Sequence, residues 1–121
     1  MGYARTKKKL VPRVRYTTSL PISLELIGTQ NLYELSTVNI SRGGVFIEYD
    51  EAYLPFHENS LLEVQIHLDS GEDAPRVNFV GKFVHHRIGE GFGIKISQME
   101  DADRNLWDDF LIEMDRDHGE G

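Results

Sequence analysis

Short apolar runs separated by turn residues are the feature that most limits how this 121-residue chain folds. The segment 61–68, LLEVQIHL, repeats apolar side chains at every second position, as a strand with one buried face does. Glycine, asparagine and aspartate in the breaks between runs favour hairpins, so we expect six antiparallel strands in a small barrel or sandwich. The six runs are 20–28, 31–40, 44–50, 61–68, 77–88 and 91–97.

After Asp101 and Asp103, either of which can cap a helix, the apolar period changes to three and four residues. This spacing predicts one amphipathic helix that packs against the strands. Its apolar stripe contains Leu106, Trp107, Phe110, Leu111 and Met114. The acidic residues off this stripe are expected to form a solvated face, and they are Asp108, Asp109 and Glu113.

The length and the absence of cysteine predict a single domain that depends on its hydrophobic core, without disulfides or thiolate metal sites. We expect a flexible basic arm at 1–16, the strands and helix at 17–115, and a frayed tail at 116–121. No run is long and apolar enough for a membrane-spanning helix or a signal peptide, which predicts a cytoplasmic protein.

The net charge of −7 is distributed unevenly along the chain. Residues 1–24 carry six basic side chains and no acidic one, so the remainder has a net charge of −13. The six are Arg5, Lys7, Lys8, Lys9, Arg13 and Arg15. Such an arm binds phosphate on nucleic acid, on lipid headgroups or on a nucleotide, or else it docks weakly on its own acidic body.

The hexapeptide NISRGG, residues 39–44, lies between the second and third runs and matches the pattern Asn/Asp-x-Ser-x-x-Gly. By itself it predicts a hairpin turn with local hydrogen bonds from Asn39 and Ser41. Here it follows a basic arm that ends in Pro12-Arg13, and it precedes the strand GFGIKIS and the last helix. In this order the chain resembles, over about residues 8–114, a PilZ domain, the bacterial receptor module for cyclic di-GMP.

The resemblance implies a mainly β fold, a six-stranded antiparallel barrel with a C-terminal helix. It also implies two ligand-binding elements, an Arg-x-x-x-Arg at the end of the arm and the Asn/Asp-x-Ser-x-x-Gly turn. The turn is intact, whereas the arm has Lys9 in the position of the first arginine. The implied ligand-binding residues are Lys9, Arg13, Asn39, Ser41 and Gly44, with Arg15, Arg42 and Gly43 as additional candidates.

These residue types suit a cyclic dinucleotide. The planar guanidinium of Arg13 can meet the guanine O6 and N7 acceptors together, or stack on the purine. Lys9 offers only a point charge, so we expect binding weaker by about 1–3 kcal/mol than a two-arginine arm would give, unless Arg15 or Arg42 compensates. Asn39 can pair with a guanine edge and Ser41 with a phosphate oxygen, while glycines let the backbone approach the ligand.

The sequence therefore predicts a non-enzymatic cyclic di-GMP receptor without a cofactor. It would order its arm on binding, leave residues 101–114 little changed, and signal through an unidentified downstream protein. One alternative is a degenerate PilZ-like interaction module that does not bind the nucleotide, which Lys9 favours. A second, a nucleic-acid binder, is disfavoured by the acidic body. No catalytic or metal site is expected, because His85 and His86 as strand neighbours point to opposite faces.

Overall fold

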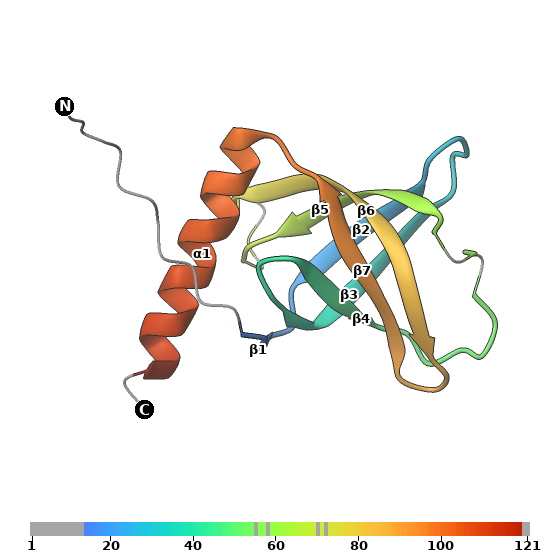
Figure 1. Ribbon diagram of the computed structural model, residues 1–121, viewed down its shortest axis with the longest axis horizontal. Coiled ribbons are helices and arrows are strands. Elements are labelled where there is room, and N and C mark those ends of the chain that lie inside the picture. The colour runs from blue at the N-terminus through green and yellow to red at the C-terminus, as the bar shows by residue number, and fades with distance from the viewer. Residues whose placement is uncertain (1–13, 55, 58, 70, 72, 120–121) are drawn as a thin grey trace.

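The computed structural model describes residues 14–119, except 55, 58, 70 and 72, and side chains only as far as residue 117 at the C-terminal end. This part of the chain contains seven strands and one helix (Figure 1). They are β1 (Tyr16–Thr17), β2 (Pro21–Leu26), β3 (Leu32–Ile40), β4 (Gly44–Glu48), β5 (Leu61–His67), β6 (Arg76–Arg87), β7 (Gly91–Gln98) and α1 (Asp101–Gly119).

The six longer strands form a closed antiparallel barrel, in the order β3-β2-β5-β6-β7-β4, with β4 pairing back onto β3. They correspond one to one with the six apolar runs, so the expected strands are confirmed and the barrel is the architecture they adopt. Two of the predicted turns contain glycines in the left-handed region, Gly28 with φ 94° and Gly89 with φ 83°. Both conformations are accessible to glycine at no steric cost, which explains these residues.

The barrel interior is filled by the alternate residues of the strands, as the period-two pattern predicts. The loop between β4 and β5 contributes Phe56, whose ring packs edge-on against Phe92 and lies beside Phe83. This loop therefore adds an aromatic side chain to the core. Further apolar residues of the long strands are fully or almost fully buried, among them Ile22, Leu24, Ile40, Val45, Ile47, Leu62, Val64, Ile66, Val77, Phe79 and Ile94.

The short strand β1 attaches the end of the N-terminal arm to the barrel. Tyr16 pairs with Ile40 of β3 and is buried. Behind it, the buried hydroxyl of Thr37 donates to Thr18 O at 2.6 Å and accepts from Leu20 N at 2.9 Å. The predicted boundary of the flexible arm at residue 16 is therefore too late in the sequence, because Tyr16 is fixed by sheet pairing and burial.

Helix α1 stands beside one end of the barrel (Figure 1). Trp107 and Leu111 are completely buried, and Phe110 and Met114 are partly buried against the core. Two sequence expectations were wrong: Leu106 is 41% exposed, and Asp108, expected on a solvated face, is buried. The buried face is centred on the i, i+4 pair of positions 107 and 111, and position 106 turns away from it.

The helix also continues to Gly119, past the expected boundary at 115. Within the described residues, no helix is long and apolar enough to span a membrane.

Candidate functional site

The turn at residues 39–44 connects β3 to β4. Ser41 N donates to Gly44 O at 2.8 Å, and the Ser41 hydroxyl donates to the same oxygen at 3.2 Å. Just before the turn, the β3–β4 register shifts between Thr37 and Asn39. The hydrogen bonds that hairpin chemistry predicts for Ser41 are thus present, and they fix the shape of the turn.

The two glycines of the turn have different surroundings. A Cβ atom added to Gly44 would lie 2.5 Å from the backbone oxygen of Ile94 on β7, a distance that requires the backbone to move. A Cβ atom added to Gly43 would meet nothing within 4 Å, although Gly43 O accepts a 2.8 Å hydrogen bond from Ile96 N. Close strand packing is therefore sufficient to require glycine at position 44.

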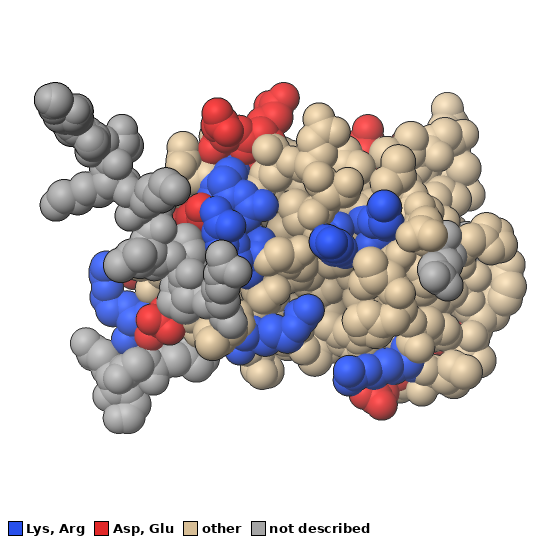
Figure 2. Space-filling view, viewed as in Figure 1, with Lys and Arg blue, Asp and Glu red and all other residues tan. Residues whose placement is uncertain are grey.

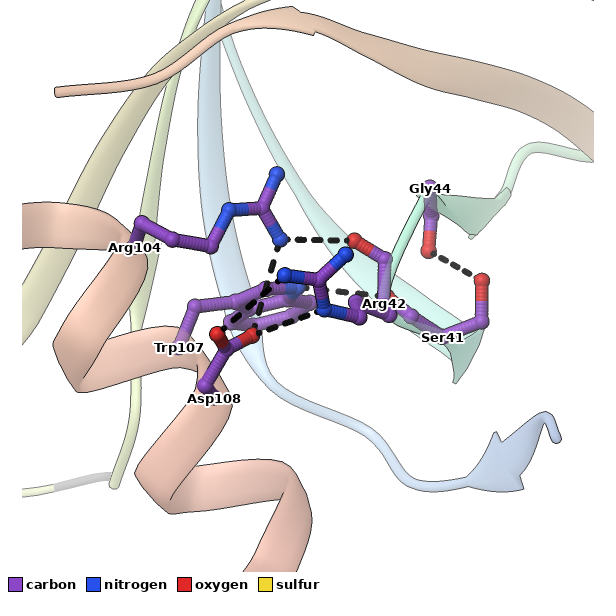
Figure 3. Close-up of polar contacts among 6 residues, drawn as sticks. All are labelled: Ser41, Arg42, Gly44, Arg104, Trp107 and Asp108. Atoms are coloured by element: carbon purple, nitrogen blue, oxygen red, sulfur yellow. Dashed lines mark hydrogen bonds and ion pairs between the residues drawn. The ribbon is translucent and has the colours of Figure 1, made fainter. Parts of the chain in front are cut away.

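Helix α1 holds the turn through two hydrogen bonds to its backbone (Figure 3). Trp107 Nε1 donates to Ser41 O at 3.2 Å, and Arg104 Nη1 donates to Arg42 O at 3.0 Å. Both acceptors belong to residues of the turn between β3 and β4. We call these two contacts, together with the ion pairs of Asp108 described next, the helix clamp.

Asp108 is the electrostatic centre of the helix clamp. Its carboxylate is only 7% exposed and faces two guanidinium groups (Figure 3). Oδ1 lies 3.4 Å from Arg42 Nε and 3.6 Å from Arg104 Nη1, and Arg42 Nη2 lies 3.5 Å from Oδ2. Burial makes an uncompensated carboxylate costly, so the two arginines neutralise a charge that the interior would otherwise disfavour.

The end of the N-terminal arm reaches the same turn. Arg15 Nη1 donates to Asn39 Oδ1 at 2.7 Å. The Tyr16 hydroxyl donates to Asp115 Oδ1 of α1 at 2.7 Å. Burial of Tyr16, and next the hydrogen bond and negative charge of Asp115, raise the pKa of Tyr16 to about 12. The arm, the turn and the helix thus meet at one end of the barrel.

These three elements enclose a pocket of about 420 Å³, which we call the arginine pocket. It is lined by Val14, Arg15, Ser41, Arg42, Gly43 and Arg104. Three guanidinium groups therefore line one hollow, and none of its described lining residues is acidic. In the space-filling view, Lys and Arg side chains gather where α1 meets the barrel (Figure 2).

A second hollow of about 580 Å³, the acidic groove, lies over the outer surface of β2, β5 and β6 and beside the start of α1. Glu25 and Glu63 face each other there as directly paired residues of neighbouring strands. Its remaining lining residues are Ser23, Leu32, Val64, Gln65, Asn78, Phe79, Val80, Gln98, Met99, Glu100 and Asp103. The larger hollow thus repels anions.

The structure brings together most of the site residues predicted from the sequence. Four of them line the arginine pocket or contact a lining residue directly, and they are Arg15, Asn39, Ser41 and Arg42. Gly43 also lines the pocket and Gly44 closes the turn. Lys9 and Arg13 lie outside the described residues.

Sequence reasoning missed the contribution of α1 to this site. Arg104 lines the pocket, Trp107 holds the turn as well as packing in the core, and Asp108 pairs with Arg42. The i, i+4 spacing of Arg104 and Asp108 was a readable signal for an ion pair. The part of the chain that the structure describes contains no group of three or more His, Asp or Glu residues positioned to hold a metal ion.

Comparison with known proteins gives a family and a fold. A family model described as PilZ domain matches residues 11–113. A search of curated proteins finds no match to the sequence. Among solved structures, the Bacillus subtilis inhibitor of motility, MotI/DgrA, superposes with a TM-score of 0.72 at 14% sequence identity. The match covers 93% of this chain and 53% of that protein, so the chain spans about half its length.

Proposed function

This chain belongs to the PilZ domain family, and on that premise we propose that it is a receptor for cyclic di-GMP. Binding would order the N-terminal arm against the barrel and create a surface that a downstream protein recognises. Such a receptor needs a binding site and a change of shape, and it needs no catalytic group.

The observation that carries this proposal is the composition of the arginine pocket. Arg15, Arg42 and Arg104 line a hollow next to the turn that contains Asn39 and Ser41. A ligand with two phosphates carries the opposite charge, and guanidinium groups form the strongest planar pairs with phosphate oxygens. The pocket volume of about 420 Å³ is in the range of sites for small ligands.

The guanine bases of the ligand can pair with arginine and with Asn39. A guanidinium can pair with O6 and N7 of guanine or stack on its face, which a simple phosphate site does not require. Asn39 offers an amide that pairs with a base edge once Arg15 turns toward the ligand. Arginines next to an amide thus suit a nucleotide better than an inorganic anion.

The arm joins the pocket through the chain itself. Val14 lines the pocket, so Arg13 is bonded to a lining residue, and Lys9 is five residues from it. Five residues span at most about 18 Å, so the arm is long enough for Lys9 to reach a ligand in the pocket. We infer that Lys9 contacts a phosphate and Arg13 a guanine.

Calorimetric titration with cyclic di-GMP tests this function, with GTP and single-stranded DNA as control ligands. Asn39→Ala and Ser41→Ala are each expected to weaken binding by about tenfold or more, because each removes a hydrogen bond to a charged or base group. Their thermal unfolding should remain close to wild type, since both side chains are only partly buried and the backbone bond from Ser41 N to Gly44 O remains in either variant.

Unchanged affinity in both variants would refute the assignment of the turn as a ligand site. Absence of any binding by the wild-type protein would favour the alternative, a PilZ-like interaction module in which Lys9 has replaced an essential arginine. Binding to DNA with the same affinity as to cyclic di-GMP would favour a general phosphate-binding arm.

Hydrogen exchange tests the ordering of the arm. We expect residues 5–13 to gain strong protection when saturating cyclic di-GMP is added, while Tyr16, already paired with β3, changes little. Equal protection of residues 5–13 with and without ligand would exclude arm ordering as the signal, even if the nucleotide binds.

A further inference from the structure

We propose that Arg104 of α1 is a phosphate-binding residue of the arginine pocket, and that Asp108 is an internal anion with which the ligand competes for Arg42 and Arg104. This inference rests on the proposed function and adds the helix to the site. It predicts that α1 takes part in the conformational change on ligand binding. The sequence analysis, by contrast, predicted little change in residues 101–114 on binding.

The position of Arg104 is the first step. It lines the pocket together with Arg15 and Arg42, and its side chain is 27% exposed. One of its Nη atoms bonds to Arg42 O at 3.0 Å, and a guanidinium has five N–H donors, so others are available to an anion. Arg104 thus supplies the pocket with a third fork-shaped cation, which offsets the lysine at position 9.

The geometry of Asp108 is the second step. Among the described residues, Asp108 Oδ1 has no hydrogen-bond partner, although the Arg42 and Arg104 nitrogens lie 3.4 Å and 3.6 Å away. Ionic hydrogen bonds between a guanidinium and a carboxylate are shorter, at about 2.7–2.9 Å. Asp108 therefore neutralises both arginines without saturating either one, and a phosphate in the pocket can form shorter bonds to the same groups.

Competition for these arginines links ligand binding to α1. If Arg42 and Arg104 turn toward a phosphate, the buried carboxylate of Asp108 loses its counter-ions, and this is unfavourable unless the carboxylate reaches water. A shift of α1 away from the turn would bring water to this carboxylate, and it would lengthen the bonds from Trp107 to Ser41 and from Arg104 to Arg42. Ligand binding is then expected to loosen the helix clamp.

Trp107 provides a direct probe of the clamp. It is the only tryptophan of the chain, it is completely buried, and its indole N–H donates to the turn. Its indole ¹H–¹⁵N signal and its fluorescence therefore report on the helix clamp without any label. We expect cyclic di-GMP to shift the indole signal with the same dissociation constant that calorimetry gives.

Two pairs of variants test the roles of the side chains in the full chain. Arg104→Gln is expected to weaken cyclic di-GMP binding by about tenfold to a hundredfold, whereas Arg116→Gln, an exposed arginine on the same helix paired with Glu113, should leave it unchanged. Asp108→Asn removes the competing charge and is expected to tighten binding by at least threefold. Asp109→Asn, the exposed neighbour with the same change in charge, is the control.

The outcomes separate this inference from the proposed function. Wild-type affinity in Arg104→Gln, with weakened binding in Ser41→Ala, overturns the role of Arg104 and leaves the receptor function intact. Equal affinities of Asp108→Asn and Asp109→Asn overturn the competition. If the wild-type protein does not bind cyclic di-GMP, the receptor function fails, and titration with inorganic pyrophosphate then tests the phosphate site by itself. A shift of the Trp107 indole signal that Arg104→Gln abolishes supports the phosphate site. No shift of this signal in the wild-type protein overturns it.

Discussion

The two hollows beside the first turn of α1 differ in charge more than in size. The arginine pocket has about 420 Å³ and three guanidinium groups, whereas the acidic groove has about 580 Å³ and four acidic residues among those that line it. Arg104 lines one and its neighbour Asp103 lines the other. The acidic groove has the larger volume, but its charge opposes an anionic ligand, whereas the charge of the arginine pocket suits the dianionic nucleotide that we propose as ligand.

The hollows also differ in how they are built. The acidic groove lies on the outer surface of continuous strands, where backbone pairing is complete and side chains alone set the chemistry. The arginine pocket is assembled from an arm, a turn and a helix, and its shape depends on the bonds between them. A site assembled from separate elements can change shape when one contact changes, whereas a strand surface cannot.

The largest expected effect comes from the turn glycines, because the arginine pocket depends on the close approach of the turn to β7. Gly44→Ala would bring a Cβ atom to 2.5 Å from Ile94 O and is expected to lower the free energy of unfolding by about 1–3 kcal/mol. Gly43→Ala meets nothing within 4 Å and should stay within about 0.5 kcal/mol of wild type. Urea unfolding of the two variants measures the difference.

Equal stability of the two glycine variants would show that the backbone of the turn moves away from β7 at little cost and accommodates the added Cβ atom at position 44. A stable Gly44→Ala protein with weakened cyclic di-GMP binding would instead give this glycine the ligand-contact role that the family pattern implies.

The sequence pattern was sufficient to predict the six long strands, because each strand is specified locally, whereas the closed barrel was implied by the resemblance to PilZ domains. Apolar residues at every second position and turn residues between runs determine both the strand and its buried face. The strand β1 escaped prediction, since two residues carry no periodicity and Tyr16 is fixed by β3 and by Asp115, which is 99 residues away in the sequence. Local pattern thus predicts the long strands, but neither the closure of the barrel nor where β1 and α1 attach to it.

The site was predicted only in part for the same reason. The turn residues follow from a contiguous motif, and the arm from its charge. The helix clamp joins Arg42 to Asp108, which lies 66 residues later in the sequence. The sequence of α1 shows that Arg104 and Asp108 lie on the same face of the helix, but it does not show that this face contacts the turn. Buried charge pairs of this kind are determined by tertiary packing, and periodicity does not reveal them.

A smaller effect is expected at Tyr16, which links β1 to α1 on the side of the arginine pocket. Its pKa in the folded protein is about 12, and the ordinary value of 10.0 applies to the unfolded chain. Between these pH values the folded state keeps a proton that the unfolded state has lost, so this contribution to stability is complete below pH 10 and is lost as the pH rises toward 12.

Tyr16→Phe removes this contribution. We expect the variant to be less stable than wild type at pH 8 by about 1 kcal/mol, the usual net contribution of one partly exposed hydrogen bond, and the gap should close by pH 11.5. Chemical unfolding at the two pH values measures the difference in the free energy of unfolding between the two proteins. Tyr49, whose pKa is also raised by burial, is present in both and does not affect this difference. A gap independent of pH would show that the hydroxyl does not hold its proton through Asp115.

The smallest effect is expected in the acidic groove, where Glu25 and Glu63 are directly paired across β2 and β5. Like charges in such positions repel, so Glu63→Gln is expected to raise the free energy of unfolding by about 0.2–1 kcal/mol. Glu34→Gln makes the same change in charge on β3 opposite the uncharged Ser23, and it should leave stability unchanged.

Both glutamate variants should bind cyclic di-GMP within about twofold of wild type, because neither residue lines the arginine pocket and salt screens the interactions of exposed charges. Binding that strengthens several-fold in Glu63→Gln and not in Glu34→Gln would mean that the acidic groove contributes to the nucleotide site. The assignment of ligand binding to the arginine pocket alone would then be wrong. Unchanged affinity together with the gain in stability would instead establish that the groove bears a charge conflict unrelated to the nucleotide.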